Sequence, residues 1–132
     1  MPHVIEMRTY KTTPGMRQHF MDILVKRSFP AHRQIGMKVL GPFPSVDDPD
    51  TFFWMRGFPD LPSRDQMRNQ FYEGTLWKTE LEEVLLPILE KYEVVLAEDP
   101  GHLLGVHFDA LSSNAETVVE QLAVAGATRR CT

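Results

Sequence analysis

The start of the chain alternates between two sets of side chains with a period of two residues, which is typical of a strand with two different faces. Over residues 4–10, one set is Ile5, Met7 and Thr9, and the other is Val4, Glu6, Arg8 and Tyr10. Because an apolar face usually packs on a core, we expect helices to cover the side of Ile5 and Met7. The charged side would then have no cover from its own chain.

A helix is predicted directly after this strand. Thr13 is a favourable N-cap, Pro14 suits the first helical position, and apolar residues then recur at helical spacing. These are Met16, Phe20, Ile23 and Leu24. The helix is expected to run to about Phe29 and to stop or kink there, because Pro30 has no N–H and disfavours helix before it. Gly36 would close any continuation.

Two further strands are predicted at residues 37–43 and 51–58, joined by turn-forming residues and paired as a hairpin. In the second of them, one face carries Phe52, Trp54, Arg56 and Phe58, and the other carries Phe53 and Met55. Both faces are largely apolar, so we expect both to be covered.

Two helices and a strand are predicted next. Residues 60–74 form a short helix with Asp60 or Ser63 as its cap and Gly74 at its end. Residues 77–89 carry the clearest apolar stripe in the sequence, with Pro87 bending the last turn. Residues 92–98 are rich in β-branched side chains and predict the fourth strand.

The order strand, helix, strand, strand, helical pair, strand is typical of the ferredoxin-like α+β class, in which helices cover one face of a four-stranded antiparallel sheet. An uncovered sheet face that bears several aromatic side chains usually marks an interface. A second copy of the sheet would close it. We therefore expect a homodimer that forms a two-chain αβ barrel, and higher oligomers are compatible with the same pattern.

Residues 1–98 are predicted to form this domain, and residues 99–132 a C-terminal extension. Alternation over residues 104–110 and a capping box at residues 113–116 predict one more strand and one more helix. The extension is either an arm laid against the partner chain or the remnant of a second βα repeat.

The amino-acid composition argues against several classes of binding partner. The formal net charge is −4 and the pI is about 5.7, which argues against general binding of nucleic acid or anionic lipid. The single cysteine, Cys131, permits no internal disulfide and no cysteine metal cluster, so we expect a reducing, cytoplasmic location. No apolar run reaches membrane length, and no signal peptide is expected because the start of the chain alternates.

Several stretches of the sequence form a pattern that extends over the whole predicted domain. They are V-I-E-M-R-T-Y at residues 4–10, T-P-G-M at 13–16, K-V-L-G at 38–41, F-F-W-M-R-G-F at 52–58 with Arg64 and Arg68 after it, and Trp77 with Pro87 beyond. Together these stretches resemble the NIPSNAP family. The resemblance spans about residues 3 to 98 and implies a dimeric αβ barrel. Animal members of the family are associated with vesicle traffic and mitochondrial quality control. Relatives by fold include cofactor-free monooxygenases of polyketide quinones and haem-binding enzymes.

The candidate ligand-binding residues lie on two predicted strands. Glu6, Arg8 and Tyr10 are two residues apart, so they present a carboxylate, a cation and a phenol on one face. Arg8 could clamp a small polar or anionic ligand, with Tyr10 as a donor or proton relay. Trp54 and Arg56 could add an aromatic wall and a second cation. The structural alternative is that Glu6 pairs with buried cations and that Trp54 packs at the dimer interface.

Three functions are compatible with this pattern. The first is a small-molecule site, of unknown reaction, in the cavity between sheet and helices. The second is a non-enzymatic interaction or scaffold dimer, favoured by the lack of hydrolase, kinase and dinucleotide motifs and by the extra tail. The third, by analogy of fold, is a cofactor-free monooxygenase. No cofactor is expected, since none of the five histidines has the spacing of a metal pair and nothing else points to haem.

Overall fold

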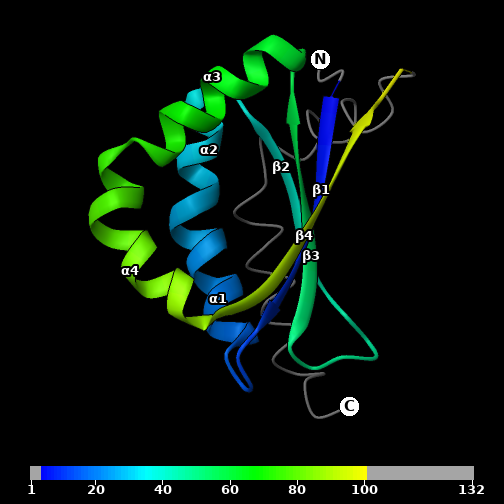
Figure 1. The fold of residues 1–132 in the computed structure, drawn as a ribbon, viewed down its shortest axis with the longest axis vertical. Helices are drawn as coiled ribbons and strands as arrows, with labels where there is room; N and C mark the ends of the chain where they lie inside the picture. Colours follow the sequence, from blue (N-terminus) through cyan, green and yellow to red (C-terminus); the bar gives the residue numbers. More distant parts are fainter. Residues whose placement is uncertain (1–3, 101–132) are drawn as a thin grey trace.

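The computed structural model describes residues 4–100, and Figure 1 shows the helices packed as one layer against one face of a sheet. The elements are β1 (Val4–Thr12), α1 (Arg17–Ile23), η1 (Leu24–Ser28), α2 (Phe29–Ile35), β2 (Lys38–Pro44), β3 (Thr51–Phe58), α3 (Leu61–Tyr72), η2 (Trp77–Leu81), α4 (Glu82–Leu85), η3 (Leu86–Ile88) and β4 (Leu89–Glu98). Neighbouring strands pair antiparallel in the order β2-β3-β1-β4. This topology confirms the predicted ferredoxin-like α+β class.

Strand β1 lies inside the sheet, between β3 and β4. Its register places Glu6 opposite Arg56 and Arg8 opposite Trp54, and Tyr10 follows on the same face. Directly opposed residues of antiparallel strands project to the same side of a sheet. The residues singled out on the two predicted strands therefore lie together.

The prediction of which face the helices cover is wrong. Glu6, Arg8 and Tyr10 face the helix layer and are buried, whereas Met7 on the opposite face is 39% exposed. The alternation groups the side chains correctly but does not by itself say which group lies inside. A charged group can occupy the inside only where its charges are paired and hydrogen-bonded.

The sheet face away from the helices is mostly apolar and is left largely uncovered by residues 4–100 (Figure 1). By register, this outer face carries Ile5, Met7, Leu40, Phe43, Phe53, Met55 and Val95. Strand β4 is also exposed along most of its length. The expectation that both faces of β3 are covered therefore does not hold within the described part of the chain.

The first helical segment begins later than predicted. Thr13 and Pro14 lie in a turn, and α1 begins at Arg17 with Met16 as its N-cap. The turn is held instead by a tertiary contact, because the N–H of Thr13 donates to the carbonyl of Ile88 at 2.9 Å. This contact holds the backbone of Thr13 against the end of η3, ahead of the helix.

The predicted stop or kink near Pro30 takes the form of a π turn. Helical structure continues through Pro30 and ends at Gly36, as predicted. Directly before Pro30 lies η1, in which the N–H of Phe29 donates to the carbonyl of Leu24, five residues earlier. A residue without an N–H disturbs the regular helical ladder, and π turns accommodate such disturbances, often beside functional sites.

The helical segments between β3 and β4 are less regular than the apolar stripe of residues 77–89 predicts. Helix α3 begins as expected, with the Asp60 side chain accepting a 2.7 Å hydrogen bond from the N–H of Ser63. Residues 77–88 then form the π turn η2, the short helix α4 and the 3₁₀ turn η3, which contains Pro87. Pro87 thus alters the last turn, as predicted.

The remaining boundaries agree with the sequence within a few residues. Strands β2 and β3 match their predicted ranges, and β4 begins at Leu89, before the predicted start at residue 92. The strand and helix expected in the C-terminal extension lie outside the described residues.

Gly41 of β2 allows a test of how closely the hairpin packs. Its φ is +116°, and an added Cβ would lie 3.0 Å from Trp54 Cβ and 3.1 Å from Trp54 Cα. We predict that Gly41→Ala lowers the free energy of unfolding by about 2 to 4 kcal/mol, because a steric clash adds to the cost of a positive φ. Chemical denaturation measures this loss.

The matched control is Gly15→Ala. Gly15 also has a positive φ, +81°, but no atom lies within 4 Å of an added Cβ. The free energy of unfolding of this variant should fall by only about 1 kcal/mol, which is the cost of placing alanine at a positive φ. Equal losses in the two variants would show that the contact with Trp54 is not tight.

Candidate functional site

A fully buried carboxylate lies on the helix-facing side of the sheet. Glu6 accepts hydrogen bonds from Arg8 Nη1 at 2.6 Å and from Arg56 Nε at 2.8 Å. From helix α3, Arg64 Nε donates to it at 2.6 Å, and Arg68 Nε is 3.9 Å away. Arg64 and Arg68 stand one turn apart on the helix, so both reach the same point. We call these five residues the Glu6 cluster.

The arginines determine the charge of this carboxyl group. Burial would raise the pKa of Glu6, but the charges of Arg56 and Arg8 and the hydrogen bonds from Arg64 and Arg56 outweigh burial and lower the pKa to about 2. Glu6 is therefore ionised at neutral pH. Four guanidinium groups share this one carboxylate, so the cluster carries three more positive than negative charges.

Aromatic rings cover the cationic side chains. The Arg8 guanidinium lies 5.6 Å from the ring centroid of Tyr10 and 5.7 Å from that of Trp54. The Arg56 guanidinium lies 5.6 Å from the rings of both Trp54 and Tyr72. The electron-rich faces of these rings stabilise cations that have lost their water.

The Tyr10 hydroxyl is a neutral partner of this cluster. Arg8 Nε donates to it at 2.8 Å, which leaves the hydroxyl proton free to be donated elsewhere. Burial raises the pKa of Tyr10 more strongly than the charge of Arg8 lowers it, so the hydroxyl stays protonated at neutral pH.

A buried histidine meets the cluster from the helix layer. His32 Nδ1 is 2.8 Å from the carbonyl oxygen of Ser28, and His32 Nε2 is 3.0 Å from Arg56 Nη1. Because a guanidinium can only donate, Nε2 must be the acceptor, and the ring proton lies on Nδ1. Burial and the charge of Arg56 lower the pKa of His32 to about 3, so the ring is neutral at physiological pH.

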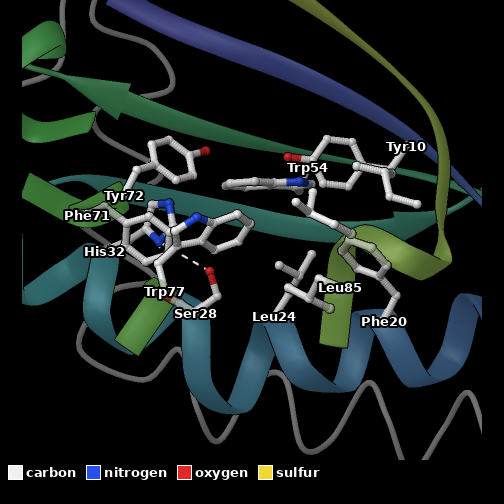
Figure 2. Close-up of a pocket in the computed structure, with 12 residues that line it drawn as sticks. Tyr10, Phe20, Leu24, Ser28, His32, Trp54, Phe71, Tyr72, Trp77 and Leu85 are labelled. Atoms are coloured by element: carbon white, nitrogen blue, oxygen red, sulfur yellow. Dashed lines mark hydrogen bonds between the residues drawn. The ribbon is translucent and has the colours of Figure 1, made fainter. Parts of the chain in front are cut away.

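A small cavity lies between the sheet and two helical walls (Figure 2). One wall consists of α1, η1 and α2, and the other consists of α3, η2, α4 and η3. Its volume is about 40 Å³, enough for a few water molecules. In Figure 2 the hydroxyls of Tyr10 and Tyr72 point toward one another. Within the described part of the chain, the buried Nε1 of Trp54 has no hydrogen-bond partner. The lining residues are Tyr10, Phe20, Leu24, Ser28, His32, Trp54, Phe71, Tyr72, Trp77, Leu85, Leu86 and Leu89.

The five predicted ligand-binding residues lie close together and form two groups. Tyr10 and Trp54 line the cavity. Glu6, Arg8 and Arg56 lie next to these rings, in the ion-pair network. The structural interpretation of Glu6 as a partner of buried cations agrees with this geometry, and the ligand-binding role of all five stays a prediction.

The alternative interpretation of Trp54, as a side chain packed at a dimer interface, is wrong. Trp54 is buried within its own chain, and its ring centroid lies 5.1 Å from that of Phe29 and 5.5 Å from that of His32. The physical reason is the same reversal of faces, because the side of β3 that carries Trp54 meets the helix layer.

Three members of the site are not predicted from the sequence pattern. Arg64 and Arg68 enter the sequence interpretation only through the family resemblance, although their spacing of four on a predicted helix places them on one face. His32 follows Pro30 in a stretch where the helix was expected to be interrupted, so its position relative to the sheet could not be inferred.

Among residues 4–100, no group of three or more histidine, cysteine, aspartate or glutamate side chains is placed to hold a metal ion. Over the same range, no helix is both long enough and apolar enough to span a membrane.

The architecture matches solved structures. An uncharacterized NIPSNAP domain protein from Burkholderia xenovorans superposes with a TM-score of 0.62 at 21% identity, covering 71% of this chain and 91% of that one. A NIPSNAP family protein from Agrobacterium tumefaciens gives 0.65 at 20% identity, covering 75% and 88%. This chain has the NIPSNAP fold. The resemblance read from the sequence is thereby confirmed at the level of architecture.

The NIPSNAP fold is shared with other proteins at still lower identity. A candidate antibiotic biosynthesis monooxygenase from Nitrosomonas europaea superposes with a TM-score of 0.58 at 11% identity, covering 74% of this chain and 98% of that one. No protein-family model and no curated protein matches the chain. Likeness at these identities shows the fold alone.

The buried neutral His32 makes stability depend on pH. Its pKa is about 3 in the folded protein and 6.5 when unperturbed, so below pH 6.5 the unfolded chain binds the extra proton. Stability is then fully present above pH 6.5 and falls by about 1.4 kcal/mol per pH unit as the pH drops toward 3. Glu6, whose pKa falls from 4.5 to about 2, adds its own loss only below pH 4.5.

We predict that His32→Gln removes this slope between pH 6.5 and pH 4.5, because Gln retains an acceptor for Arg56 but does not titrate. Urea unfolding at several pH values measures the slope in both proteins. An unchanged slope in the variant would mean that His32 is charged or exposed in the folded protein.

Proposed function

We propose that this NIPSNAP-fold protein binds a small molecule in the cavity between the sheet and the helices. The supporting observation is that buried polar groups converge on a cavity walled by aromatic rings. They are the hydroxyl of Tyr10, the neutral ring of His32 and Nε1 of Trp54, which has no hydrogen-bond partner within residues 4–100. Small-molecule sites typically combine an apolar lining with a few placed polar groups. A buried donor without a partner is unfavourable in a purely structural core, which favours a site.

The wall formed by residues 77–88 is the part that can enlarge the cavity. At about 40 Å³ the cavity is smaller than the roughly 150 Å³ that admits a benzene ring, so a ligand of that size must displace a wall. Trp77 and Leu86 belong to short π and 3₁₀ turns, whose hydrogen-bond geometry is poorer than that of a regular α-helix. An exposed ion pair between Arg27 and Glu80 connects this wall to η1. Because exposed ion pairs add little stability, this contact does little to hold the wall in place.

Binding is proposed in preference to catalysis because of how His32 is held. Its Nε2 accepts from Arg56 and its Nδ1 donates to Ser28, so neither ring nitrogen is free to take a proton from a ligand. The monooxygenase alternative therefore gains no support from this side chain. It rests on the likeness of fold to a candidate monooxygenase.

We also propose that the protein is a homodimer whose outer sheet faces meet. The outer face carries large apolar side chains from all four strands, and Phe43, Phe53 and Val95 are each more than a third exposed. Contiguous exposed apolar surface of this kind marks an interface, and a second copy presents the same surface in return. The alternative function is a non-enzymatic interaction or scaffold dimer, in which residues 99–132 would recruit the partner.

Filling the cavity tests the binding proposal. Leu85 lines the cavity and is buried, whereas its neighbour Val84 is 42% exposed. We predict that wild-type protein purified from cells retains a small molecule in native mass spectrometry and that Leu85→Phe loses it, because the larger ring occupies the space. Val84→Phe should retain it. Circular dichroism checks that both variants fold, since overpacking costs about 1 to 3 kcal/mol.

A charge on the outer face tests the dimer. Met55 lies opposite Met7 in the register, near the middle of this face. We predict that Met55→Glu converts the dimer to a folded monomer, because the interface would bury an unpaired charge. Light scattering after size exclusion measures the mass. Val46→Glu, at a fully exposed hairpin position, should leave the dimer intact. A wild-type monomer would contradict the proposal.

A further inference from the structure

We propose that the ligand is an anion with an apolar body, and that its carboxylate is held by Arg8, Arg56 and Arg68 at the end of the cavity next to the Glu6 cluster. This inference rests on the proposed binding function and names its ligand class. The arginines supply the specificity for charge, and the aromatic walls hold the body.

The first argument is the excess of positive charge around Glu6, where Arg8 and Arg56 are buried. Glu6 is the one carboxylate that Arg8, Arg56, Arg64 and Arg68 share within the described residues. Arg56 is fully buried, and its Nη2 has no hydrogen-bond partner in that part of the chain. Desolvated cations are unfavourable unless a counter-charge and hydrogen bonds compensate for lost water. A second carboxylate at this place would supply both.

The second argument is that the Glu6 cluster and the cavity share a wall. Tyr10, Trp54 and Tyr72 line the cavity, and each ring also lies within 6 Å of an arginine of the cluster. Arg8 donates to the Tyr10 hydroxyl, and Arg56 donates to His32, so the guanidinium groups reach the polar atoms of the lining. The arginines do not themselves line the cavity, so the proposed acid would place its carboxylate between the rings of this shared wall to meet them, with its apolar body in the cavity.

The third argument is the state of Arg68. Its Nε has no hydrogen-bond partner among the described residues and lies 3.9 Å from Glu6, and its side chain is 35% exposed. Arg64, in contrast, is hydrogen-bonded to Glu6 and lies 3.6 Å from Asp65. Arg68 is thus the member of the cluster that is least committed to Glu6 and open to solvent. It is the natural first contact for an incoming anion.

A carboxylate fits this place better than a larger oxyanion. The planar guanidinium fork matches a carboxylate in two-point hydrogen bonding. Around Glu6, three guanidinium groups already donate one hydrogen bond each to a carboxylate, at 2.6 to 2.8 Å. The narrow, mostly apolar cavity also favours an acid attached to an apolar body over a free inorganic ion. Glu6 competes with the ligand for the same guanidinium groups.

The experiment compares probes that differ in charge but hardly in shape. Both tryptophans of the chain, Trp54 and Trp77, line the cavity, so tryptophan fluorescence of the full-length protein reports occupancy. Benzoate and benzamide are titrated separately, with acetate and inorganic phosphate as anions that lack an apolar body. We expect benzoate to bind about tenfold or more tightly than benzamide, since hydrogen bonds to charged groups are stronger than those between neutral groups.

Three variants refine the comparison. Arg68→Gln should remove most of the preference for benzoate over benzamide, whereas Lys26→Gln, which makes the same change of charge at an exposed helical position, should leave it unchanged. Glu6→Gln should strengthen benzoate binding by removing the competing carboxylate. Because Glu6→Gln could disturb folding, the comparison of Arg68→Gln with Lys26→Gln decides by itself.

The outcomes separate the two proposals. A preference for benzoate that Arg68→Gln removes supports the inference. Equal binding of benzoate and benzamide overturns the anion inference and leaves the cavity proposal standing. Binding of acetate or phosphate with no gain from the benzene ring overturns the apolar body and shows a site for free anions. If no probe binds, both proposals fail.

Discussion

The ion pairs of Glu6 join the two layers of this protein. The carboxylate comes from the inner strand β1, and its partners come from β1, β3 and α3, so the contacts pass from sheet to helix layer. Because the carboxylate is fully buried, its neighbours must be cations, hydrogen-bond donors or aromatic faces that stabilise those cations. Around these cations, Tyr10 and His32 accept hydrogen bonds from Arg8 and Arg56, and Trp54 covers Arg8 with its ring.

The structural and functional interpretations of these residues are therefore not alternatives. A buried carboxylate surrounded by a surplus of arginines is stable only in an environment of aromatic faces and neutral polar groups. That environment is also what the proposed apolar acid ligand would require. Removal from water makes it unfavourable to bury an arginine without a counter-charge. The same removal from water strengthens the attraction between the arginine and a counter-charge.

Much of the fold could be predicted because local patterns define it. Alternation identified the strands, the Asp60 cap marked the start of α3, and Gly36 marked the end of α2. What the pattern does not contain is the direction in which each face points, since alternation is symmetric. The usual assumption that the apolar face lies inside failed here because long-range ion pairs from Arg56 and Arg64 compensate for burying Glu6. Both of those contacts join residues at least 50 positions apart, which no local window can detect.

The π turns η1 and η2 have a consequence for how proteins of this fold can diverge. A π turn holds one residue more than the α-helical turn it replaces, and η1 lies between Phe20 and His32, which both line the cavity. Because the π turn takes up this extra residue, the helical segments on either side face the same way as in a regular helix that is one residue shorter. Loss of one residue from η1 would therefore leave Phe20 and His32 facing the cavity. The length of this helix can thus change by one residue during divergence while the side chains on either side of η1 keep their positions.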